Sequence, residues 1–257
     1  MFERATNDEN ILNEWYKLFE LQFGVINPFE VEAIQKYLSN FKVRHLVDVG
    51  FGSGDLTVAL KKDSAFSVDG LEPEKYFYDK TLAKFPNSDV NFINIALATY
   101  KKTTDCLFFR FVFQHYPEKD QLCREASRLL PQKGIVIVVE SFSIQTNPVI
   151  KSYAYISEQF VKFYKRGPSS ELERHTTRAF IDSGFRLAHR ELLKLPTHSK
   201  IQKENFGKML FNAGVVKAIT SNQNLNAIGS LQEELKCLHS NTCQIDYYDI
   251  VLIFEKL

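Results

Sequence analysis

Apolar and polar positions follow two different periods along the chain. In residues 9–40, apolar residues recur at intervals of three and four on either side of Asn27 and Pro28, which predicts two helices joined by a turn. After Val43, short apolar runs alternate with segments of helical spacing. This pattern predicts strands at 45–50, 66–73, 90–97, 105–113 and 134–143, and helices that begin near 55, cover 74–84 and cover 118–130.

The second half of the chain is less regular. From Gln145 the sequence is rich in tyrosine and phenylalanine, and a helical segment at 171–185 is stopped by Gly184. A further strand is predicted at 186–195, a mostly helical stretch at 199–240, and a strongly β-prone strand at 245–257. Strands that alternate with helices indicate an α/β fold with a parallel, doubly wound sheet and helices on both faces. No repeat or flexible linker marks a boundary, so we expect one domain over 1–257.

Composition and charge narrow the class of protein. The chain has 257 residues, 44% of them hydrophobic, and 32 Lys and Arg against 31 Asp and Glu. A core of full size is therefore expected, without a net field that would attract nucleic acid or a membrane surface. The first ten residues do not resemble a secretory signal, and no window reaches the ~20 apolar residues of a membrane span. The four cysteines form no metal-binding spacing, so we expect a cytoplasmic protein without a metal site.

The stretch "VDVGFGSG" at 47–54 carries the candidate chemistry. Three of the eleven glycines fall within five positions, directly between a predicted strand and a predicted helix. Ligands of open α/β sheets bind at this location, and glycine lets the backbone approach them closely. A phosphate-binding loop would need a lysine directly after the last glycine, and a nicotinamide-binding turn would need wider glycine spacing. Neither pattern is present.

An acidic residue two positions before the glycine-rich turn GxGxG resembles the first motif of the class I S-adenosylmethionine-dependent methyltransferases. The resemblance extends from about Val43 to Ser141. It implies a Rossmann-like, mostly parallel sheet of seven strands with the last strand antiparallel. It also implies S-adenosylmethionine as the cofactor and S-adenosylhomocysteine as its product.

The resemblance assigns roles to individual residues. Asp48 would organise the loop and meet the methionine end of the cofactor, and Glu72 would accept hydrogen bonds from both ribose hydroxyls. The stretch from Arg110 onward would line the junction of cofactor and substrate. The family commonly has an acid near the adenine, but here the chain reads Asn94-Ile95-Ala96, which departs from that pattern. The expected cofactor-binding residues are Asp48, Gly50, Phe51, Gly52, Gly54, Glu72, Pro73, Asn94, Ile95, Ala96 and Arg110.

Candidates for catalysis and for acceptor binding lie outside the glycine-rich turn. His115 follows the fourth strand and can titrate near neutrality, which makes it the candidate base, with Tyr116 and Glu140 as weaker alternatives. Trp15, Tyr16 and Tyr153 are the candidate substrate residues. The helices of 1–42 would form a lid over the cofactor-binding core at 43–144, and two insertions, 145–180 and 199–240, would close the substrate side. Each of these aromatic residues could instead serve only to pack the accessory helices.

We therefore expect methyl transfer to the oxygen or nitrogen of a small molecule by a monomer or homodimer. Two alternatives stay open. A local excess of six positive charges between Lys151 and Lys203 would suit an RNA or protein acceptor, and the irregular residues 94–96 would suit a cofactor-binding module without catalysis.

Overall fold

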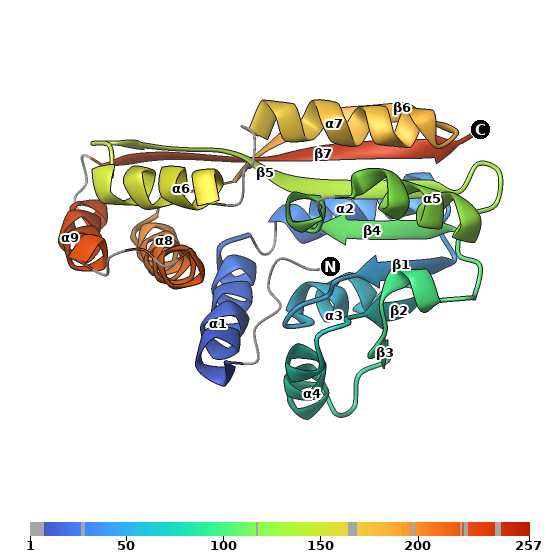
Figure 1. Ribbon diagram of the computed structural model, residues 1–257. Coiled ribbons are helices and arrows are strands. Elements are labelled where there is room, and N and C mark those ends of the chain that lie inside the picture. Colours follow the sequence, from blue (N-terminus) through green and yellow to red (C-terminus); the bar gives the residue numbers. More distant parts are fainter. Residues whose placement is uncertain are drawn as a thin grey trace.

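The computed structural model describes residues 8–26, 29–116, 118–163, 169–195, 197, 199–221, 223, 226–239 and 243–257. Within these residues seven strands form one sheet in the order β3-β2-β1-β4-β5-β7-β6 (Figure 1). The β7 strand runs antiparallel to both of its neighbours, and the pairs among β1 to β5 are parallel. This confirms the predicted sheet. The strands are β1 (His45–Val49), β2 (Ser67–Leu71), β3 (Asn91–Ile93), β4 (Cys106–Arg110), β5 (Ile135–Asn147), β6 (Phe185–Leu195) and β7 (Gln244–Lys256).

Helices connect the strands and extend the fold beyond the sheet. None of those in the described ranges is long and apolar enough to cross a membrane. The turn predicted at Asn27 and Pro28 lies outside the described residues. The helices are α1 (Glu9–Ile26), α2 (Phe29–Asn40), α3 (Asp55–Lys61), α4 (Lys75–Lys84), α5 (Lys119–Leu129), α6 (Lys151–Phe163), α7 (Ser169–Asp182), α8 (Lys200–Thr220) and α9 (Asn226–Glu234), with short 3-10 turns η1 (Leu97–Thr99), η2 (Phe113–His115) and η3 (Leu235–His239).

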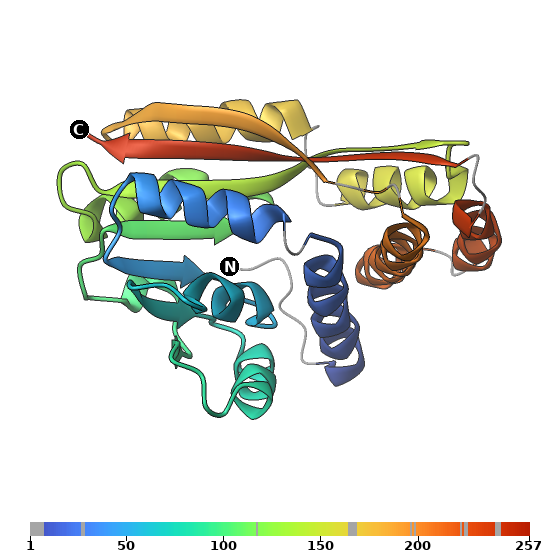
Figure 2. The same cartoon turned by 180° about the vertical axis from the view of Figure 1, so that it is seen from behind.

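The sheet is covered on both faces because its strands are apolar on both faces. Alternate residues of one strand enter different cores: Phe108 packs with α2 and α3, and Phe109 packs with α5 and α7. Figure 2 shows α2 in front of the sheet, and Figure 1 shows α5 and α7 on the opposite side. A third core joins α1, α6, α8 and α9. Of the predicted N-terminal pair, α2 therefore belongs to the sheet, and α1 belongs to the accessory helices.

The β5 and β7 strands continue past the sheet as a long two-stranded ribbon (Figure 1). The pairing shifts register between Ser141 and Ser143 and then runs on to Asn147, opposite Gln244. The β5 strand thus ends later than the expected boundary at 143, because polar residues can extend a ribbon that faces solvent once a partner strand is present. The ribbon carries α6, α8 and α9 toward the ends of β1, β2 and β4.

A buried ion pair connects α2 to the sheet. The Nε of Arg110 donates to Oε1 of Glu30 at 2.8 Å, and the Glu30 side chain is fully buried. Asp249 of β7 is also fully buried, and its pKa is raised well above the ordinary value by burial and by the Glu30 carboxylate. The surroundings of Asp249 therefore favour its protonated form, and Glu30 is the acid that pairs directly with Arg110.

Replacing Glu30 by glutamine should lower the free energy of unfolding by about 3 kcal/mol, because the guanidinium of Arg110 loses its buried counter-ion. Denaturant unfolding measures this change. Asp249 can ionise in place of Glu30, so the double variant Glu30→Gln, Asp249→Asn should lose more than the sum of the two single variants. Additive losses would contradict this account. Asp79→Ala, which removes an exposed pair with Lys75, serves as the control and should change stability by less than ~0.5 kcal/mol.

Candidate functional site

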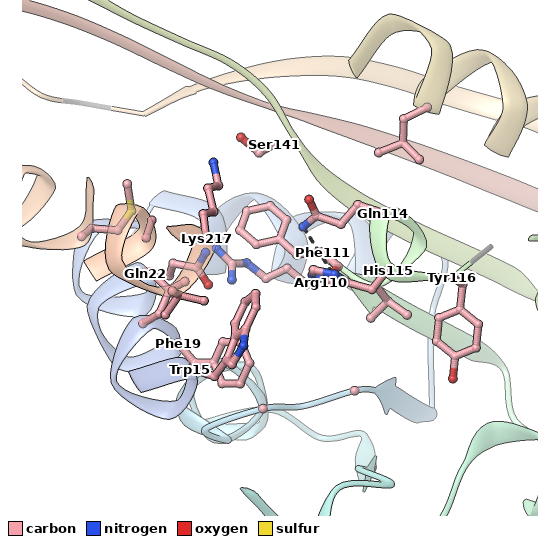
Figure 3. A pocket seen from close by; sticks show the side chains of 18 of the residues that line it. Trp15, Phe19, Gln22, Arg110, Phe111, Gln114, His115, Tyr116, Ser141 and Lys217 are labelled. Carbon is pink, nitrogen blue, oxygen red and sulfur yellow. Dashed lines mark hydrogen bonds between the residues drawn. The ribbon is translucent and has the colours of Figure 1, made fainter. Parts of the chain in front are cut away.

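A cavity of about 690 Å³ lies where β1, β2 and β4 end, bordered by α1, α6 and α8 (Figure 3). Its walls come from segments far apart in the sequence. Figure 3 shows Trp15 and Phe19 of α1 opposite Gln114 and His115 of the turn that follows β4. The cavity has two parts, the glycine-rich turn with the strand ends, and a side formed by the accessory helices.

The glycine-rich turn adopts a conformation that other residues rarely reach. Gly50, Gly52 and Gly54 have φ angles of 78°, 59° and 73°. Gly50 and Gly52 line the cavity, but Gly54 does not. A Cβ atom at Gly54 would lie 2.5 Å from Cγ2 of Thr81, so this glycine allows α4 to pack against the turn.

The turn is also tightly covered from α1. A Cβ atom at Gly52 would lie 2.9 Å from Cδ2 of Phe19. The bare backbone at this position therefore lets an aromatic ring of α1 lie directly on the turn. Phe51 and Ser53 complete the part of the turn that lines the cavity.

Asp48 is the buried acid at the start of the turn. Its Oδ2 accepts a hydrogen bond from the hydroxyl of Thr57 at 2.6 Å. Burial raises its pKa to about 6, although the hydrogen bond from Thr57 and the charge of Arg110 act in the opposite direction. Asp48 lines the cavity, so a cationic group bound beside it would stabilise the ionised carboxylate.

Glu72 follows β2 and its carboxylate is fixed by two backbone groups. Oε2 accepts from the amide of Gly52 at 3.1 Å, and Oε1 accepts from the amide of Glu74 at 3.0 Å. Asn94 donates to the carbonyl oxygen of Glu72 at 2.7 Å. A carboxylate oxygen has two lone pairs and can accept more than one hydrogen bond. Glu72 lines the cavity, and this geometry suits a ligand that carries two neighbouring hydroxyls.

Several expected binding residues lie away from the cavity lining. The Asn94-Ile95-Ala96 segment supports the end of β2 rather than bordering the cavity, and Pro73 is exposed. Tyr16 packs on Phe77 of α4, with ring centroids 6.4 Å apart. The expected residues that do line the cavity are Trp15, Asp48, Gly50, Phe51, Gly52, Glu72, Arg110, His115 and Tyr153.

Two expected residues, Arg110 and His115, lie at the end of β4 and on the segment that follows it. Phe111 has a φ of 57°, an unusual backbone for a non-glycine residue, and its ring lies 4.0 Å from the guanidinium carbon of Arg110. His115 is buried and meets Trp15 edge to face, with ring centroids 5.8 Å apart. Glu140 is not at the cavity, because its Oε1 accepts from the amide of Phe113 at 2.8 Å and thereby fixes the turn that carries His115.

The accessory side of the cavity contains the expected Tyr153 together with two residues that the sequence analysis did not name, Ser157 and Lys217. Lys217 of α8 donates to the hydroxyls of Tyr153 and Ser157 of α6, each at 3.0 Å. All three line the cavity. Tyr155 and Phe163 are more than half exposed, and Tyr164 lies outside the described residues. In the part of the chain that the structure describes, no cluster of three or more His, Cys, Asp or Glu could hold a metal ion.

Residues 47–138 match the family described as "Methyltransferase domain". This match covers the turn, the strand ends and the segment with His115, and it identifies a methyltransferase domain in this part of the chain. We found no significant sequence match among curated proteins.

Solved structures share the fold at low sequence identity. A protein from Galdieria sulphuraria described as a sarcosine dimethylglycine methyltransferase has 12% identity and a TM-score of 0.58, with 88% of this chain and 85% of that chain covered. The mycolic acid cyclopropane synthase CmaA1, crystallised with S-adenosylhomocysteine, has 15% identity and a TM-score of 0.58 over 98% and 99% of the two chains. The cyclase SpnF has 15% identity and a TM-score of 0.54, with coverages of 88% and 82%.

The buried Asp48 makes the stability of the ligand-free protein depend on pH. Its raised pKa means that the folded state holds a proton between about pH 4 and 6 that the unfolded state releases, so this contribution to stability is present below pH 4 and lost as the pH rises through 6. Replacing Asp48 by asparagine should remove this pH-dependent contribution to the stability of the fold. The free energy of unfolding of the wild type minus that of the variant should fall by about 2.4 kcal/mol from pH 4 to 7. A difference that stays constant with pH in denaturant unfolding would contradict the assignment.

Proposed function

We propose that this methyltransferase transfers the methyl group of S-adenosylmethionine to a small molecule held in the cavity. The observation that carries the proposal is the cavity of about 690 Å³ in which the glycine-rich turn and the accessory helices α1, α6 and α8 face one another. This volume lies in the range of small-molecule sites. A cavity walled by helices on the acceptor side suits a compact acceptor better than a polymer.

Five residues of the turn and the strand ends are proposed to hold the cofactor. Glu72 offers two oxygens to the ribose hydroxyls, and Asp48 lies where it can face the positively charged methionine end. Gly50, Phe51 and Gly52 supply a surface without bulky polar groups for the body of the ligand. When bound, the cofactor supplies an electrophilic methyl group on a sulfonium. In-line displacement then requires mainly that donor and acceptor be aligned.

His115 is proposed as the group that removes the proton of the acceptor. It lines the cavity directly after β4, and its ring orientation is set by the edge-to-face contact with Trp15. Burial and the charge of Glu72 raise the pKa of the neighbouring Tyr116, so that hydroxyl stays protonated at neutral pH and suits a donor better than a base. An oxygen and a nitrogen acceptor both fit this arrangement.

The parts around the core are proposed to act with it as one domain over 1–257. The α1 helix would be the lid, because Trp15 and Phe19 line the cavity and Phe19 lies on Gly52. The segments 145–180 and 199–240 would supply the acceptor side through α6, α7 and α8.

An RNA or protein acceptor is less well supported. Among the described residues, several positive side chains between 151 and 203 pair with acids, which reduces the local excess of positive charge. Arg190 pairs with Glu173 at 2.6 Å and Lys194 pairs with Asp246 at 2.5 Å. Steep salt dependence of binding to nucleic acid would reverse this preference.

Replacing Glu72 by alanine should weaken the binding of S-adenosylmethionine by about 1.5 kcal/mol or more, roughly tenfold in Kd, because hydrogen bonds to a charged acceptor are lost. Isothermal titration calorimetry measures the change. Glu74→Ala is the matched control, since Glu74 lies two residues away and accepts from the amide of Tyr76 at the start of α4. An unchanged Kd for the Glu72 variant would refute the assigned cofactor site.

Incubation with a metabolite extract and methyl-labelled S-adenosylmethionine tests the function itself. We expect label in a small molecule that passes an ultrafiltration membrane with a cut-off of about 3 kDa, which retains any folded domain. Label found in RNA or protein would favour the alternative acceptor. Tight cofactor binding without any labelled product would favour a module without catalysis.

A further inference from the structure

We infer that the acceptor carries an oxyanion, a carboxylate or a phosphate, and that Lys217 with the hydroxyls of Tyr153 and Ser157 binds it. The inference rests on the proposed function and names the class of its substrate. The three residues line the acceptor side of the cavity, on α6 and α8. In Figure 3 the side chain of Lys217 points toward the part of the cavity that Ser141 borders.

Hydrogen-bond geometry makes this group a donor site. The ammonium of Lys217 has three hydrogens, and two of them are used in the bonds to Tyr153 and Ser157 at 3.0 Å. Both hydroxyl oxygens act as acceptors in these bonds, so their own hydrogens point elsewhere. One N–H and two O–H donors are therefore available around one point, which suits an oxygen anion with several lone pairs.

The charge of Lys217 has no acid to balance it locally. Among the residues that the structure describes, no carboxylate lies within 4.0 Å of its Nζ. Arg110 lines the same cavity but is paired with Glu30 at 2.8 Å. The acids that line the cavity are already engaged or lie elsewhere on its wall: Asp48 binds Thr57, Glu72 binds the backbone, and Glu171 belongs to α7. A bound anion would supply the missing counter-charge.

The aromatic rings on this side argue against a cationic acceptor. Aromatic faces can hold an ammonium ligand, but here the protein's own ammonium uses them. The Nζ of Lys217 lies 4.6 Å from the ring centroid of Tyr153 and 6.0 Å from that of Phe160. A second cation at these rings would be repelled by Lys217, whereas an anion would be attracted.

Calorimetry on the complex with S-adenosylhomocysteine tests the site without turnover. The probes are benzoate, phenyl phosphate, benzyl alcohol and benzyltrimethylammonium, which share a ring and differ in charge. We expect one of the two anions to bind at least about tenfold more tightly than the neutral and cationic probes. The preferred anion then distinguishes a carboxylate from a phosphate acceptor. Tighter binding of benzyltrimethylammonium would overturn the inference.

Variants of Lys217 test whether this residue is responsible. Lys217→Met keeps the length of the side chain and should weaken anion binding by about tenfold or more, whereas Lys217→Arg should retain most of it. Ser157→Ala keeps the charge and should cause a smaller loss. Lys208→Met, on the exposed face of the same helix, is the control and should bind like the wild type. Undiminished anion binding by Lys217→Met would overturn the inference, and unchanged binding of S-adenosylhomocysteine confirms that the variant is folded.

Charge fractionation of the labelled product separates this inference from the proposed function. A product that an anion exchanger retains at neutral pH supports both. A labelled small molecule that contains neither a carboxylate nor a phosphate leaves the proposed function standing and refutes the oxyanion site. The absence of any labelled small molecule refutes the proposed function instead.

Discussion

The arrangement of the site depends on the hydrogen bonds that tie the glycine-rich turn to the end of β2. The amide of Gly50 donates to the carbonyl of Leu71 at 2.7 Å, and the amide of Gly52 donates to the carboxylate of Glu72 at 3.1 Å. These bonds require the left-handed backbone that glycine allows. They place Asp48 and Glu72, from two neighbouring strands, on the same cavity.

The half of the site built on this turn could be predicted because its signal is local. A strand, a turn of three glycines, a helix and an acid after the next strand follow one another within about thirty residues of sequence. The parallel sheet then brings the ends of these strands together without further information. The same reasoning named Asn94, Ile95 and Ala96, which follow β3; Asn94 donates to the carbonyl of Glu72, and none of the three lines the cavity. A strand end gives the position of a residue along the chain, but the direction of its side chain depends on the local turn.

The acceptor side could be predicted only in part, because no short segment contains it. Trp15, Tyr153 and Lys217 come from helices near the start, middle and end of the chain, and they meet because the β5–β7 ribbon carries α6 and α8 over the strand ends. A lysine on a helix is usually a solvated residue, and the sequence around 217 contains nothing that marks it as different. Its partners, Tyr153 and Ser157, lie on α6, and only the packing of α6 against α8 brings them within hydrogen-bonding distance. The sequence did indicate aromatic residues on this side: of the three named candidates, Trp15 and Tyr153 line the cavity and Tyr16 does not.

The distribution of charge links the two halves of the site. The core neutralises its buried charges internally, through Arg110 with Glu30 and through the raised pKa of Asp249. Lys217 is treated differently, since hydroxyls and aromatic rings surround it instead of carboxylates. If the acceptor is an anion, it lies in a cavity that holds a sulfonium at one side and an ammonium at the other, and both attract it. Methyl transfer removes the charge of the sulfonium, so the product complex retains one of these two cations. The anionic product is then held less strongly than the anionic substrate, which favours its release after the reaction.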